Sequence, residues 1–462
     1  MFLKRLHNQS EGKKTLFLDT LHLSIGQGAK FITQAVYFVL IARSLGPASY
    51  GAFVAITALT GIVSPFCGLG SSNLFVRNLR AGRRTAQVCW GNGLVLTLAS
   101  GVLLSFVITA GNYLVGLKAT YSTIFIVAVC DLVFMRITDL ATFGFAADGD
   151  MKQTAFQSFL MSALRLVAIA VLVWRYHTVT VHQWVGAYVI TGILGATYAL
   201  WMALHRWGIP SWDASAARED IREGIFFSIS TSAQSIYNDI DKTMLGRLAS
   251  MGDTGIYGAA YRFIDVSMTP VRSLISAAYP RFFKIGSEEG LRGTRKYALR
   301  LISKSVLYGL GIFFALTVLS PVIPLFLGHK YDAVVPAVRW LAVIPFLRCI
   351  HAFLADALAG ANMQIRRTVI QIGVAVVNVF LNLWILPRWS WRGAAWTSIA
   401  SDALLAISLW VCIQLTLRLQ MGGLPQGVAL TGKAAVPGLG NAQLSALYMR
   451  QSDGSLHDRD RD

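Results

Sequence analysis

The most regularly spaced polar side chains lie in the apolar stretch at about residues 224–246. Five of them recur at intervals of three or four residues, which puts them on one face of a helix: Ser228, Ser232, Ser235, Asp239 and Lys242. Four more occupy the adjacent face: Thr231, Gln234, Asn238 and Asp241. A helix that is polar over half of its circumference does not face lipid. We therefore expect this helix to line a hydrated cavity.

Charged and amide side chains also interrupt the other apolar stretches. A charge inside a membrane span costs roughly 2.5–3.5 kcal/mol, so each one needs a partner, a ligand or water. We predict that a substrate-binding cavity is lined from the following set: Lys30, Gln34, Arg165, Asp239, Asp241, Lys242, Arg262, Asp265, Arg272 and Asn378.

A simpler interpretation is that these charges pair with one another. Arg262 and Asp265 are three residues apart on one helix, and Asp239 and Lys242 have the same spacing. Lys30 and Arg165 have no partner nearby in the sequence, which makes each a better ligand candidate. An aspartate on another helix is the alternative partner for both, and the sequence leaves the two interpretations open.

The elements that carry these residues are predicted to be membrane-spanning helices. Of 462 residues, 55% are hydrophobic and 14% charged, whereas soluble domains are about 25% charged. Apolar runs of roughly 20 residues, the length that crosses a bilayer, recur along the chain. We draw twelve spans: 20–42, 51–70, 88–110, 122–146, 154–175, 184–205, 224–246, 255–279, 299–327, 334–360, 366–386 and 392–419. The predicted fold class is an all-α integral membrane protein.

The net charge of +18 is concentrated in every second gap between these spans, for example at Arg77–Arg84 and at residues 281–304. This placement is typical of cytoplasmic loops, and it argues against a nucleic-acid-binding face. Both termini are therefore predicted to be cytoplasmic. The predicted organisation is a cytoplasmic N-terminal segment, a six-helix lobe, a cytoplasmic linker, a second six-helix lobe and a disordered cytoplasmic tail: 1–19, 20–206, 207–223, 224–419 and 420–462.

A short internal repeat supports the division into two lobes. Tyr-Gly-Ala occurs at Tyr50–Ala52 and again at Tyr257–Ala259, each time in the second span of a group of six. Each copy is followed by a proline inside the span, Pro65 or Pro270. Two repeated halves with a site between them are a common plan of transporters.

Motifs of enzymes are absent from the sequence. It contains no HExxH, no nucleophile elbow and no Walker loop. The five cysteines form no CxxC pair, so we expect neither a disulfide framework nor a zinc site. We predict no catalytic residues, no metal and no cofactor.

Three segments together resemble the Wzx-type polysaccharide and O-antigen flippases of the multidrug/oligosaccharidyl-lipid/polysaccharide (MOP) superfamily. They are Ala42–Gly51, Asp239–Gly246 with the following Gly255–Arg262, and Asn378–Pro387 with the following Gly393–Ala395. The resemblance extends from about residue 20 to 419. It implies two six-helix bundles, related by a pseudo-twofold axis, around a central cavity.

The resemblance further implies transport of an undecaprenyl-diphosphate-linked oligosaccharide across a bacterial inner membrane. Its expected partners are that lipid-linked substrate, membrane lipids, and the polymerase and chain-length proteins of polysaccharide assembly. Two other functions stay open: a cation-coupled multidrug antiporter, with Asp239 or Asp241 as its ion site, and a membrane glycan polymerase or ligase. The polymerase or ligase is disfavoured because all predicted outer loops are short.

Overall fold

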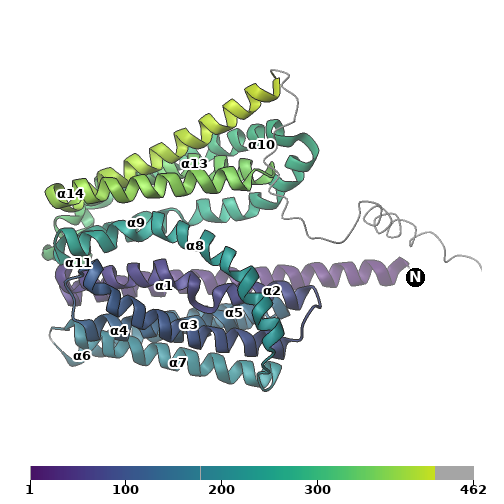
Figure 1. The fold of residues 1–462 in the computed structure, drawn as a ribbon, viewed down its shortest axis with the longest axis horizontal. Coiled ribbons are helices and arrows are strands. Elements are labelled where there is room, and N and C mark those ends of the chain that lie inside the picture. Colours follow the sequence, from purple (N-terminus) through teal and green to yellow (C-terminus); the bar gives the residue numbers. More distant parts are fainter. Residues whose placement is uncertain (1, 177, 422–462) are drawn as a thin grey trace, which may run out of the picture. The chain divides into compact units, whose positions relative to one another are not determined.

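In the computed structural model, all regular elements of the described residues are helices (Figure 1). The structure describes the backbone of residues 2–176 and 178–421, and the side chains of 30–420 except those at 177, 226, 227, 230 and 233. The predicted disordered tail therefore lies almost wholly outside the described residues. Residues Met1–Gln414 form one compact unit, and every contact described below lies within it.

The first half of the chain forms seven α-helices. They are α1 (Phe2–Val63), α2 (Ser71–Arg80), α3 (Ala86–Val115), α4 (Tyr121–Val129), α5 (Met135–Asp148), α6 (Met151–Arg175) and α7 (Val181–Trp207). A 3-10 turn, η1 (Ser64–Gly70), joins α1 to α2, and a π-helical turn, η2 (Cys130–Phe134), joins α4 to α5. Helix α1 thus begins well before the predicted first span at residue 20.

The described part of the second half, up to residue 421, also forms seven α-helices. They are α8 (Ala214–Leu248), α9 (Met251–Ser267), α10 (Thr269–Leu319), α11 (Ile323–Leu327), α12 (Val334–Leu341), α13 (Ile344–Gly360) and α14 (Gln364–Met421), with 3-10 turns η3 (Ser320–Val322) and η4 (His329–Tyr331). Pro65 and Pro270, the repeated prolines, both lie at the start of an element, where a proline leaves no backbone donor unpaired.

Seven helical segments of the described chain are long and apolar enough to cross a membrane. Three of them, Lys30–Arg80, Thr269–Leu327 and Gln364–Gln420, are 51, 59 and 57 residues long, whereas one crossing needs about 20. Each contains a backbone break with positive φ, at Gly46, Gly290 or Ser390. Nine of the twelve predicted spans fall on continuous helical backbone, and three are interrupted, at Cys67–Leu69, at Met268 and at residues 342–343. The number of crossings itself remains a prediction.

Gaps that were predicted to lie on the same side of the membrane contact one another. Among the predicted outer gaps, the Lys118 Nζ donates to the carbonyl of Ala249 at 2.9 Å, and the Ser390 hydroxyl donates to Asp253 at 2.7 Å. Among the predicted inner gaps, Arg206 pairs with Asp148 at 2.6 Å. This grouping agrees with the predicted alternation of loops, and the side on which each group lies stays a prediction.

The two segments that carry the internal repeat pack directly against each other where α1 crosses α9. A Cβ atom added to Gly51 would lie 1.8 Å from the Met251 carbonyl oxygen. One added to Gly255 would lie 1.9 Å from the Pro47 carbonyl oxygen. The contact is reciprocal, and both glycines are required because the two backbones touch, as in other close helix crossings in membranes.

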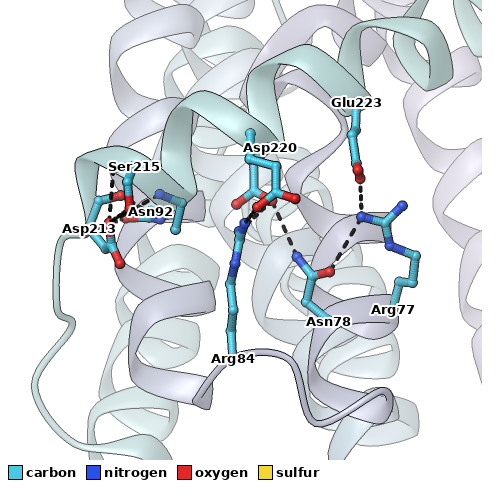
Figure 2. Close-up of polar contacts among 10 residues, drawn as sticks. Arg77, Asn78, Arg84, Asn92, Asp213, Ser215, Asp220 and Glu223 are labelled. Atoms are coloured by element: carbon cyan, nitrogen blue, oxygen red, sulfur yellow. Dashed lines mark hydrogen bonds and ion pairs between the residues drawn. The ribbon is translucent and has the colours of Figure 1, made fainter. Parts of the chain in front are cut away.

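The segment predicted as an inter-lobe linker is bound tightly to α2 and α3 (Figure 2). The Arg84 guanidinium contacts Asp220 at 2.6 Å and Glu219 at 2.5 Å, and Arg77 pairs with Glu223. Asn78 adds a hydrogen bond to Asp220 at 3.3 Å. We call these six residues the α2–α8 clamp.

Asp213 and Asn92 fix the start of α8 on the same surface. The Asn92 side chain donates to the Asp213 carbonyl at 3.1 Å and accepts from the Asp213 amide at 3.0 Å. The Asp213 carboxylate caps α8 by accepting from the amides of Ser215 and Ala216. The linker is therefore part of the folded structure.

Candidate functional site

A cavity of about 500 Å³ lies beside the C-terminal half of α8, as the polar pattern of that helix predicts. Its walls come from α8, α9, the start of α10, α13 and α14. The ionisable residues that line it are Asp239, Lys242, Arg262, Asp265, Arg272, Arg348 and His351. Five of these, all but Arg348 and His351, belong to the predicted set.

Only part of the polar surface of α8 faces this cavity. Gln234 and Asn238 line it, one helical turn apart. Ser228 and Ser232 are buried instead, and the Ser232 hydroxyl donates to the Ile62 carbonyl of α1 at 2.8 Å. The N-terminal half of the predicted stripe is thus a helix-packing surface.

Lys242 and Asp239 form an ion pair within the cavity. The Lys242 Nζ lies 2.5 Å from the Asp239 carboxylate, the contact predicted from their spacing. The same ammonium lies 4.7 Å from the centre of the Tyr261 ring, a cation–π contact. The Lys242 side chain is 12% exposed and that of Asp239 34%, so the pair is accessible from the cavity.

Asp265 is paired with arginines other than the one predicted. Its carboxylate lies 2.8 Å from Arg272 and 3.7 Å from Arg348, which come from α10 and α13. Arg262, three residues before Asp265, instead lies beside the Tyr50 hydroxyl of α1. The helical spacing allowed the pair with Arg262, but tertiary packing brought other cations nearer to Asp265.

Arg348 and His351 connect the cavity to a buried carboxylate, Asp402. Arg348 Nε lies 3.6 Å from Asp402, and His351 Nε2 lies 3.3 Å from it. The Tyr237 hydroxyl also donates to Asp402. These four residues were missed in the sequence analysis, although Arg348 and Asp402 each carry the usual signal, a charge inside an apolar stretch.

Five of the ten predicted site residues do not line the cavity, and two of these five lie in the second half of the chain. Asp241 is buried and accepts hydrogen bonds from the hydroxyls of Tyr257 and Ser398, the latter at 3.1 Å. Asn378 is also buried and donates to Ser401 at 2.9 Å, which links the two halves of α14. The polar groups of both side chains are thus hydrogen-bonded to neighbouring helical segments.

The remaining candidates lie in the N-terminal half of the chain. Arg165 donates to the Tyr188 hydroxyl at 3.0 Å, and this hydroxyl donates in turn to Asp131 at 2.5 Å. Arg165 therefore contacts a tyrosine of another helix, and Asp131 is linked to it through the Tyr188 hydroxyl and not by a direct ion pair. Gln34 donates to Ser162 at 3.4 Å, and Lys30 lies within electrostatic range of Asp139.

The charge balance determines what the cavity can bind. Four lysine and arginine side chains line it, against the two carboxylates of Asp239 and Asp265. Both carboxylates are already paired with cations within 4 Å, and Asp402 behind the wall is also paired. The surplus is positive, and arginine in particular suits the oxygens of phosphate groups.

The sequence matches the model of a family described as polysaccharide biosynthesis protein over residues 16–286. Comparison with curated protein sequences gave no match.

The fold is similar to that of solved transporters. The inward-facing conformation of a multidrug resistance MATE family transporter of the MOP superfamily has a TM-score of 0.72 at 14% identity, covering 85% of this chain and 95% of that one. The outward-facing conformation of such a transporter has a TM-score of 0.60 at 16% identity, and the match covers 88% of this chain and 97% of that one.

A third similar structure is a MOP superfamily transporter from Pyrococcus furiosus Vc1, described as having a binding pocket of reverse polarity. Its TM-score is 0.61 at 16% identity, and the match covers 87% of this chain and 96% of that one. At these identities the likeness establishes the fold over most of the chain, whereas the family match covers more than half of the sequence. Seven helical segments of the described part are long and apolar enough to cross a membrane, and their fold is similar to that of MOP superfamily transporters. The chain belongs to the polysaccharide biosynthesis protein family.

Proposed function

We propose that this transporter is a flippase, which moves an undecaprenyl-diphosphate-linked oligosaccharide across the bacterial inner membrane for exopolysaccharide, capsule or O-antigen assembly. The observation that carries the proposal is the surplus of cations on the cavity wall: Lys242, Arg262, Arg272 and Arg348. A diphosphate is a compact anion that needs several such donors once it leaves water.

The other parts of such a substrate place different demands on the protein. A sugar hydroxyl that loses water without gaining a partner costs several kcal/mol, so the glycan requires a polar path. Gln234, Asn238 and Gln371 supply amide donors and acceptors on the same wall. The polyprenyl tail needs no protein site, because it can remain in the lipid.

Alternating access is the mechanism that best accommodates these demands. Transporters with this fold have been solved in inward-facing and outward-facing conformations. Movement of an anion out of a negative cytoplasm is favoured by about 2.3 kcal/mol per charge per 100 mV. The membrane potential therefore assists export, so that coupling to protons or sodium is compatible with the proposal but not required by it.

A cation-coupled drug antiporter is the main alternative. A cationic drug needs a carboxylate that is free to pair with it, and those of Asp239 and Asp265 are already engaged by Lys242, Arg272 and Arg348. The cavity charge therefore favours the anionic substrate over the cationic one.

Depletion of the protein tests the proposal. We expect a lipid-linked oligosaccharide to accumulate on the cytoplasmic side, as measured by lipid extraction and by its resistance to glycosidases added to intact spheroplasts. Re-expression of the wild-type protein should restore export, and the Arg348→Gln variant should not. Absence of any such intermediate, together with hypersensitivity to cationic dyes, would favour the antiporter.

A further inference from the structure

Three exposed tryptophans gather on a groove where α14 folds back on itself. Trp384, Trp389 and Trp396 are 65%, 58% and 46% exposed. With four apolar or weakly polar residues and one arginine they line a volume of about 340 Å³: Leu381, Ile385, Thr397, Ala400 and Arg388. The groove lies apart from the charged cavity, with which it shares no lining residue.

The groove is held open by a fixed turn. Ser390 adopts a positive φ of 49°, which is unusual for a residue with a side chain, and its hydroxyl donates to Asp253 at 2.7 Å. Trp340 of α12 packs edge-on against Trp396, with ring centres 5.0 Å apart. From Leu381 to Arg388 the helix rises about 10 Å, so the groove runs from the turn into the apolar part of the helix pair.

Two arginines lie at the mouth of this groove, and both are exposed. Arg388 and Arg392 line a second volume of about 480 Å³ around the turn, together with Asp253, Trp389, Ser390 and Trp391. The guanidiniums lie over the rings of Trp384 and Trp391, at 6.0 and 5.5 Å. Neither arginine forms an ion pair within 4 Å with a described residue. Asp253, the one carboxylate among the residues that line this second volume, accepts from Ser250 and Ser390.

We infer that this groove is a binding site for an anionic phospholipid of the leaflet that faces the Ser390 turn. The groove takes part of one acyl chain between the tryptophans, and Arg388 and Arg392 hold the phosphate. Charge complementarity singles out this occupant: the groove wall is apolar, and two cations stand at its mouth against the single carboxylate of Asp253, with which neither forms an ion pair. A purely interfacial belt of tryptophans would need neither the groove nor the paired arginines.

Fluorescence quenching by brominated lipid tests the inference. The protein is reconstituted in phosphatidylcholine nanodiscs that contain the same fraction of either brominated phosphatidylglycerol or brominated phosphatidylcholine. We expect greater quenching by the anionic lipid. The chain has 12 tryptophans, and all of them contribute to the fluorescence. The triple variant Trp384→Phe, Trp389→Phe, Trp396→Phe removes those of the groove, so the excess quenching that it loses is the part that comes from the groove.

The arginines are tested with a charge-matched control. The pair Arg388→Gln, Arg392→Gln should lose the excess quenching by phosphatidylglycerol. The pair Arg43→Gln, Arg175→Gln removes the same charge from exposed positions in gaps on the same predicted side, and should keep it.

Size-exclusion profiles matching that of the wild type show that each variant is folded. Equal quenching by both lipids, or an excess that survives in Arg388→Gln, Arg392→Gln, would overturn the inference. Displacement of the brominated phosphatidylglycerol by a much smaller amount of undecaprenyl phosphate would also overturn it, because the groove would then belong to the tail of the transported lipid.

Discussion

At the scale of single residues, the cavity is a set of compensated charges with a positive surplus. Lys242 is the clearest case, because its ammonium is paired with Asp239 and also lies on the face of Tyr261. Such a lysine has two roles open to it. It can neutralise Asp239 permanently, or it can exchange that carboxylate for a phosphate oxygen when the substrate enters.

Lys242→Ala and its double variant separate these roles. If Lys242 contacts the diphosphate, Lys242→Ala should reduce export by about tenfold or more, since a hydrogen bond to a charged group contributes about 1.5–3 kcal/mol. Lys242→Arg should retain part of the activity, because it keeps the charge. Export is measured per molecule, with abundance determined by immunoblot of the membrane fraction.

The variant Lys242→Ala, Asp239→Asn removes both charges of the pair. Recovery of abundance without recovery of export supports contact with the substrate. Recovery of both would show that Lys242 serves only to neutralise Asp239, and this role for Lys242 in transport would be abandoned.

At the scale of elements, two features hold the halves of the chain together: the crossing of α1 with α9, and the α2–α8 clamp. The crossing depends on backbone contact at Gly51 and Gly255. The clamp depends on charge, and it binds the start of α8 to α2 and to the α2–α3 loop (Figure 2). The crossing is therefore sensitive to substitutions that add volume, and the clamp to substitutions that remove charge.

Gly255→Ala should destabilise the protein severely, because its methyl group would overlap the Pro47 carbonyl and force the helices apart. Overpacking of this kind typically costs about 1–3 kcal/mol or more. Gly252→Ala, on the same helix, is the matched control, since its Cβ would meet nothing nearer than 3.7 Å. The melting temperature in detergent measures both, and equal values for the two variants would contradict the role of the crossing.

Arg84→Gln should make stability depend more strongly on pH. Burial raises the pKa of the Asp220 carboxyl above its usual range, and the nearby Arg84 guanidinium opposes this rise. Without Arg84 the folded-state pKa is higher still, so the stability that protonated Asp220 contributes is lost as the pH rises through that pKa. The melting temperature of the variant should therefore fall further below that of the wild type at pH 8 than at pH 5.

Arg83→Gln is the control for this experiment, because Arg83 is exposed and forms no ion pair with a described residue. Melting temperatures at both pH values are compared for the three proteins. If Arg84→Gln lowers the melting temperature equally at both pH values, or more at pH 5, then Arg84 does not control the pKa of the Asp220 carboxyl.

At the scale of the whole molecule, the open question is orientation in the membrane. The positive-inside pattern places the α2–α3 loop and the turn around Gly290 in the cytoplasm, and the Ser390 turn outside. The contacts between gaps are consistent with this grouping, but they would be the same if the molecule were inverted.

Reporter fusions resolve the orientation. Fusions placed just after Arg84, and between Lys284 and Lys296, should be active as cytoplasmic reporters, and one placed after Arg392 should be active as a periplasmic reporter. The reason is the excess of lysine and arginine in the first two gaps. A periplasmic signal at either of them would overturn the predicted topology, and the Ser390 turn with its lipid groove would then face the cytoplasmic leaflet.

The sequence by itself predicted the apolar part of each helix, because a bilayer requires apolar runs of a fixed length and allows charge only between them or against protein. It did not predict the polar extensions, such as residues 2–19 of α1 and 214–223 of α8. The same constraint identified Asp239, Lys242, Asp265 and Arg272 as residues that need partners. The pairing of Asp239 with Lys242 could also be predicted, since both lie on one helix at a spacing that brings them together.

Only the tertiary structure decided which charges meet across helices. Arg348 and Asp402 are far apart in sequence, and nothing local links them to Asp265 or Tyr237. For the same reason Asp241 and Asn378 looked like cavity residues but lie in buried hydrogen-bond networks. Helical periodicity gives the direction of a side chain on its own helix, whereas its partner depends on how that helix is rotated and packed against its neighbours.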